Sequence, residues 1–156
     1  MGSTFLEMSL RFEDNGKGHN DMALRWNGRI WTCDSYYLRL DPGVLQGDES
    51  NQKVRLVLRR LVEQWLVALK QLQDGGTAFL PYDFSDQCTG WLQCQRSGDS
   101  VTISRGWATV EGWSFCPSDI GEFINHVPGF QIDGPTESTG LDELNQAINR
   151  SLAEVD

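Results

Sequence analysis

The sequence has few of the residues that build reactive centres. Only two histidines, His19 and His126, occur among its 156 residues, whereas a zinc site usually takes four Cys or His ligands at short paired spacings. No CxxC pair is found among the four cysteines, which are Cys33, Cys88, Cys94 and Cys116. We therefore expect no metal and no cofactor, and we expect reduced thiols that serve as small buried side chains.

A long apolar run and an excess of positive charge are also missing. No stretch approaches the 18 or so apolar residues of a membrane-spanning helix, and the first nine residues lack the basic head and apolar middle of a secretion signal. The net charge is −9, from 13 basic and 22 acidic residues. Because nucleic acids and anionic membranes bind cationic surfaces, we expect a protein that binds neither. The missing secretion signal leads us to expect a cytoplasmic location.

Motifs for catalysis are absent or fragmentary. The sequence contains no GxSxG, HExxH or dinucleotide-binding pattern, and residues 16–19 hold only a fragment of a phosphate-binding loop. Cys116 precedes a predicted helix start and lies ten residues before His126, a pattern that would suit a nucleophile and its base. A buried structural thiol is the favoured interpretation. Asp83 and Asp86 form a carboxylate pair, but aspartates in turns mostly bind nearby backbone amides.

The strongest positive signal is a long amphipathic helix over Asn51–Gln73. Apolar residues recur there at spacings of three and four, which places them on one stripe of a helix. Ser50 or Asp48 is the expected N-cap, and two glycines after Asp74 end the helix. The apolar stripe consists of Val54, Leu58, Leu61, Trp65, Ala68 and Leu72.

Alternating apolar residues and turn signals predict strands on both sides of this helix. A first strand is expected around Leu10, and Asn27-Gly28 lies between two alternating runs, which is typical of a tight hairpin. Another alternating run extends over residues 36–40. After the helix, residues 77–82 form a short strand, and residues 91–95 and 100–105 form a second hairpin. Residues 106–115 indicate a last strand or an ordered turn.

The C-terminal third is predicted to hold two helices and a loop. A short helix follows Pro117, and residues 127–140 are rich in Pro, Gly, Ser and Thr, which favours a loop. Residues 141–155 repeat apolar positions at helical spacing and predict an amphipathic helix, with Thr139 and Asp142 in a capping-box arrangement. This helix would either dock on the domain or remain a loosely held tail. Residues 1–8 are expected to be flexible.

The order of these elements predicts an α+β fold in a single globular domain over residues 1–156. Parallel βαβ units would alternate strand and helix regularly, and this chain does not. We expect an antiparallel sheet of about six strands with the long helix packed on one face, plus a short helix and a C-terminal helix. The oligomeric state is open, and a homodimer through the long helix or a sheet edge is one alternative.

Six tryptophans and an acidic surface suggest where the protein acts. Trp65 belongs to the helix stripe and is expected in the core, whereas tryptophans on strands and turns can anchor interfaces. Opposite potentials also accelerate the encounter with a basic partner. We expect a non-enzymatic protein-binding domain whose partner-binding surface combines Asp83, Asp86, Trp107, Glu111 and Trp113.

In overall character, the chain is similar to bacterial immunity proteins that neutralise toxins. The features that carry this resemblance are small size, acidity, tryptophan content and the lack of a catalytic constellation, and no matching residues are carried over. The resemblance implies a protein partner, with a basic toxin domain fitting the charge. The alternative is a small-ligand-binding or hydrolytic domain with a pocket between sheet and helix. Its mouth would be formed by Asp83, Asp86, Cys116 or His126.

Overall fold

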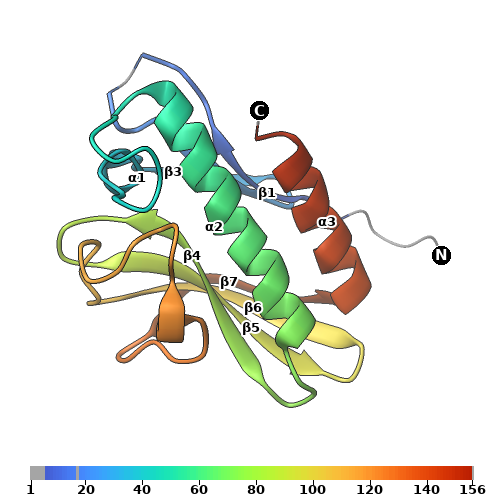
Figure 1. Ribbon diagram of the computed structural model, residues 1–156. Helices are drawn as coiled ribbons and strands as arrows, with labels where there is room; N and C mark the ends of the chain where they lie inside the picture. The colour runs from blue at the N-terminus through green and yellow to red at the C-terminus, as the bar shows by residue number, and fades with distance from the viewer. Residues whose placement is uncertain (1–5, 17, 156) are drawn as a thin grey trace.

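The computed structural model describes residues 6–16 and 18–155, and its strands form two antiparallel sheets rather than one. Figure 1 shows the two sheets with the long helix α2 lying across them. The α+β class is therefore confirmed, but the expected single sheet of about six strands is wrong. The three-stranded sheet has the order β1-β2-β3 and the four-stranded sheet the order β4-β5-β6-β7. Which strands join which sheet depends on contacts that no local pattern encodes.

The three-stranded sheet is a simple antiparallel meander. Its central hairpin turns at Asn27 and Gly28, whose φ angles of 48° and 86° are those of a tight turn. The predicted hairpin is thus confirmed. The strands are β1 (Met8–Phe12), β2 (Met22–Trp26) and β3 (Arg29–Cys33). Residues 1–8 were expected to be flexible, but Leu6 is buried and Met8 already belongs to β1. Residues 1–5 lie outside the described residues.

The four-stranded sheet contains a strand that sequence patterning missed. Most of the predicted loop over 127–140 is strand β7, the outermost strand beside β6. Its side chains are exposed or half-buried, and it contains Gly134 and Pro135. Such an edge strand shows no alternation of apolar and polar residues, and its glycine and proline are typical of a loop. The sequence pattern therefore predicted a loop. The four strands are β4 (Thr77–Phe84), β5 (Thr89–Ser97), β6 (Ser100–Ala108) and β7 (Gln131–Gly140).

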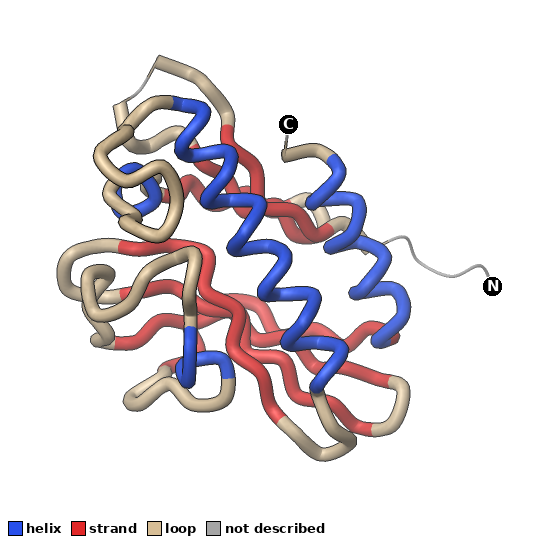
Figure 2. The backbone as a smooth tube through the Cα atoms, viewed as in Figure 1, coloured by secondary structure: helices blue, strands red, loops and turns tan. Residues whose placement is uncertain are grey.

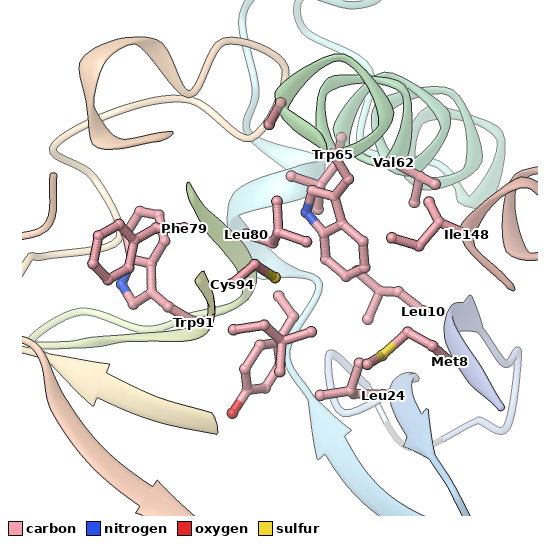
Figure 3. Close-up of a cluster of buried hydrophobic side chains, with 14 of the residues drawn as sticks. Met8, Leu10, Leu24, Val62, Trp65, Phe79, Leu80, Trp91, Cys94 and Ile148 are labelled. Carbon is pink, nitrogen blue, oxygen red and sulfur yellow. The ribbon is translucent and has the colours of Figure 1, made fainter. Parts of the chain in front are cut away.

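Helix α2 (Asn51–Gln71) covers the inner faces of both sheets. The Ser50 side chain accepts a hydrogen bond from the Lys53 amide, which confirms it as the N-cap. Trp65 is fully buried, and its indole N–H donates to the Pro81 carbonyl at 3.0 Å. Figure 3 shows the core that results. There the ring of Trp65 lies between the strands of one sheet, represented by Leu80 and Cys94, and those of the other, represented by Leu10 and Leu24.

Helix α3 (Leu141–Ala153) docks on the domain rather than remaining a tail. It packs beside α2 and against β1, as Figure 2 also shows. Leu144 and Ile148 on its inner face are fully buried. Ser151 lies on the buried face, where its Oγ accepts a hydrogen bond from the Leu10 amide at 3.0 Å. Gly140, not Thr139, occupies the N-cap position, and no side chain caps the helix. The last helix therefore covers the outer edge of the three-stranded sheet.

Two short segments differ from their predicted secondary structure. Residues 36–40 were predicted as a strand, but helix α1 covers Tyr36–Arg39. Asp34 Oδ1 accepts the Tyr36 amide at 2.7 Å, and the Arg39 guanidinium pairs with the buried Asp21 at 2.7 Å. The first of these contacts is local and the second reaches a residue 18 positions earlier. Together they outweigh the apolar alternation that predicted a strand. The predicted short helix after Pro117 is a 3₁₀ turn, η1 (Gly121–Ile124).

The segment between β6 and β7, residues 109–130, covers the other face of the four-stranded sheet. Phe115 and Phe123 pack on Trp91 with ring centroids 5.5 and 6.0 Å away, and Phe130 packs on Phe79 at 5.2 Å. Figure 3 shows Phe79 and Trp91 on the side of β4 away from Trp65. The four-stranded sheet is therefore covered on both faces at β4 and β5, whereas β7 stays exposed or half-buried. Of residues 106–115, predicted as a last strand or an ordered turn, 106–108 belong to β6 and 109–115 to this cover.

Candidate functional site

Three segments meet at one end of the molecule and form the candidate site. They are α1, the turn after β4 and residues 111–117. The Gly112 amide donates to the Ser85 carbonyl at 2.7 Å. A Cβ added at Gly112 would lie 2.6 Å from that carbonyl oxygen and 2.9 Å from the ring of Tyr37. Only glycine allows this close approach, and the approach holds the three segments together.

The first hollow at this end, called here the acidic hollow, has a volume of about 400 Å³. Its floor includes a hydrogen bond from the Tyr37 hydroxyl to Asp86, which raises the pKa of Tyr37 to about 12. Asp34 and Asp86 each use one carboxylate oxygen within this network, and the described residues offer neither of them an ion pair. The hollow is lined by His19, Asp34, Tyr36, Tyr37, Phe84, Ser85 and Asp86.

The second hollow, called here the apolar groove, has a volume of about 290 Å³ and shares Tyr37 with the first. Its most exposed large apolar side chain is that of Trp113, with 67% of its surface accessible, and Leu40 follows with 42%. Asp41 is buried and accepts hydrogen bonds from Ser118, which fixes one side of the groove to the other. The groove is lined by Tyr37, Leu40, Asp41, Pro42, Gly112, Trp113, Phe115, Cys116 and Pro117.

Three of the five residues predicted for the partner-binding surface lie at this end. Asp86 lines the acidic hollow and Trp113 lines the apolar groove. Glu111 is half-buried in the same turn as Trp113 and accepts a hydrogen bond from the Ser114 hydroxyl at 3.1 Å. The Gly112–Ser85 hydrogen bond joins these two parts of the predicted surface.

Asp83 and Trp107 line neither hollow. They lie in one row across the four-stranded sheet, where Asp83 pairs with Gly90 and Gly90 with Trp107. Both side chains are half-buried, and burial raises the pKa of the Asp83 carboxyl. Asp83 accepts the Asp34 amide at 3.2 Å. Asp83 therefore contacts the acidic hollow only through the backbone of Asp34, while Trp107 is a sheet residue.

The residues expected at the mouth of an enzyme pocket are not brought together. Cys116 lines the apolar groove, whereas His126 lines a different hollow, of about 410 Å³, beside Phe123. Burial, with Asp41 and Asp119 nearby, raises the pKa of the Cys116 thiol, which disfavours the reactive thiolate. Among residues 6–16 and 18–155, no three His, Cys, Asp or Glu side chains gather in a way that would hold a metal ion.

The residues that sequence reasoning missed come mainly from α1. Tyr36, Tyr37 and Leu40 lie in the run predicted as a strand, and Asp34 just before it was given no role, so their common surface was not foreseen. The Asp34-Ser35 pair before Tyr36 was the available signal, because Asp and Ser favour the first positions of a helix. None of the described helices is both long and apolar enough to cross a membrane.

Comparisons with known proteins add no relative. No protein-family model, curated protein or solved structure matches the chain.

Proposed function

We propose that this chain is a non-enzymatic protein-binding domain whose partner docks on the end formed by the acidic hollow and the apolar groove. The observation that carries the proposal is the exposure of Trp113. Trp26, Trp65 and Trp91 are fully buried, whereas Trp113 leaves 67% of its surface accessible beside the groove. Tryptophan is among the residues that contribute most to binding when an interface desolvates it.

The chemistry around Trp113 supports an interface rather than a packing defect. Tyr36 and Leu40 are also more than one-third exposed. Tyr36 begins α1 and lines the acidic hollow, and Leu40 follows α1 and lines the apolar groove. Aromatic side chains bordered by polar ones are characteristic of the centres of protein interfaces. The patch is also held rigidly, by Gly112 against Tyr37 and by Asp41 against Ser118, which reduces the entropy lost on binding.

The charge of this end favours a basic partner. Asp34 and Asp86 face the hollow without an ion pair among the described residues, and the chain carries a net charge of −9. Such a field steers a cationic protein toward the surface. A toxin-neutralising role of the immunity type fits these properties, and so does a cytoplasmic location. Neither nucleic acid nor membrane is proposed as a partner.

The proposal is tested by photo-crosslinking in the source cells. A photoreactive amino acid replaces Trp113 in one form of the protein and Gln146, an exposed residue of α3, in another. We expect a discrete product that contains a basic protein at position 113 and none at position 146. As a second control, co-purification without crosslinking uses the identified basic protein. There Trp113→Ala should abolish its recovery, while Ile132→Ala, which removes another exposed apolar side chain, should not. No distinct product at position 113 would refute the proposal.

A further inference from the structure

The acidic hollow and the apolar groove adjoin each other, with Tyr37 forming the wall between them. On one side of this wall, Tyr36 and Tyr37 stand edge to face with ring centroids 5.2 Å apart, and His19 packs on Tyr36 at 5.0 Å. On the other side lie Leu40 and Trp113. A ligand that filled both hollows would thus need a cationic group next to an apolar one.

We propose that the two hollows receive one extended segment of the partner, with an arginine side chain in the acidic hollow and a large apolar side chain in the apolar groove. This inference rests on the proposed protein-binding function and names the chemistry that the surface recognises. Side chains two residues apart in an extended segment point to the same side, so a single intervening residue lets the segment pass over Tyr37.

Charge and ring geometry favour arginine as the occupant of the acidic hollow. A planar guanidinium donates to carboxylates and stacks on aromatic faces at the same time, and both kinds of group line this hollow. Asp86 Oδ1 accepts from Tyr37 and Asp34 Oδ1 from the Tyr36 amide. These bonds fix both carboxylates in place before a ligand arrives, which leaves their second oxygens to meet the guanidinium.

The test uses acetylated, amidated peptides and amide-proton NMR on the intact protein. The probes are Phe-Gly-Arg, its reverse Arg-Gly-Phe, and the same peptides with citrulline in place of arginine or with glycine in place of phenylalanine. Citrulline keeps the shape of arginine without its charge. Of the two arginine peptides, we expect the one that binds better to bind about fivefold more tightly than its citrulline counterpart. Its binding should shift the amide resonances of Tyr36, Asp86 and Trp113. The preference should fall at high ionic strength.

Matched variants separate the two hollows. Asp86→Asn should remove most of the arginine preference, whereas Asp142→Asn, which changes the net charge equally at the start of α3, should leave it intact. Trp113→Ala should remove the preference for phenylalanine over glycine and retain that for arginine over citrulline. Because the arginine and citrulline peptides are also compared on the unaltered protein, the test holds even if a variant fails to fold.

Three results would overturn the inference. Equal affinity for the arginine and citrulline peptides would show that the acidic hollow does not recognise a cationic side chain. If tetramethylammonium alone bound as tightly as the arginine peptide, the site would be one for a small cation. A dimer in sedimentation that Trp113→Ala dissociates would make the occupant a second copy of this chain. If a crosslinked protein is still recovered at position 113, the first result leaves the proposed function standing. If no such product forms, the proposed function itself fails.

Discussion

Replacing Trp65 with phenylalanine tests the packing on which the whole fold depends. The indole of Trp65 is fully buried between α2 and the sheets, and its N–H donates to the Pro81 carbonyl. Phenylalanine keeps an aromatic ring but leaves that carbonyl without its buried donor, which costs about 1–3 kcal/mol. The smaller ring gives up roughly another 1 kcal/mol of apolar burial. The expected loss in the free energy of unfolding is therefore about 2–4 kcal/mol.

Urea unfolding followed by far-UV circular dichroism measures this loss without depending on tryptophan fluorescence. Trp113→Phe is the matched control, since the same chemical change at an exposed position should alter stability by less than about 0.5 kcal/mol. If Trp65→Phe cost no more than Trp113→Phe, helix α2 would not be sealed against β4 as described, and the argument for the architecture would fail.

Three further predictions follow from single contacts. Ser151→Ala should lower the free energy of unfolding by about 1–2 kcal/mol, because the buried Leu10 amide loses its acceptor, and urea unfolding will show whether α3 is held in this way. Ultraviolet titration should show one tyrosine with a pKa near 12, which Asp86→Ala returns toward 10. Because its pKa is raised in the folded state, Tyr37 contributes stability below pH 10 that is lost as the pH rises through 12. Iodoacetamide should leave the buried Cys33 and Cys94 unmodified until urea is added, since burial also raises the pKa of both thiols; rapid native labelling of either would contradict their placement.

The sequence was sufficient where a pattern repeats over many residues or where a turn has its own chemistry. The 21-residue helix α2, its Ser50 cap and the Asn27-Gly28 hairpin are examples. The apolar period of α2 persists over six turns, and Asn-Gly tolerates the positive φ angles that a tight hairpin requires. Such signals are local, so no knowledge of the rest of the chain is needed to interpret them.

Prediction failed where a distant contact decides the local structure. Helix α1 is one case, because its Arg39 pairs with the buried Asp21, 18 residues earlier in the chain, in addition to the local bond between Asp34 and the Tyr36 amide. Strand β7 is the other, because its pairing with β6 satisfies a backbone whose side chains show no apolar period. The same limit affected the site. Asp86 and Trp113 were chosen for their residue type, but their neighbours on α1 became visible only once that helix was placed.

The position of the candidate site follows from how the rest of the surface is used. Helix α2 and helix α3 cover the core and one sheet edge, and residues 109–130 cover the second face of the four-stranded sheet. Large aromatic side chains in these layers pack against other side chains of the domain. At the end where α1 meets the turn containing Gly112, the chain instead leaves Trp113 and Leu40 exposed beside carboxylates without ion pairs among the described residues. Stability alone would favour burying that tryptophan, so its exposure on a rigidly held turn supports the proposal of a partner that would complete the packing.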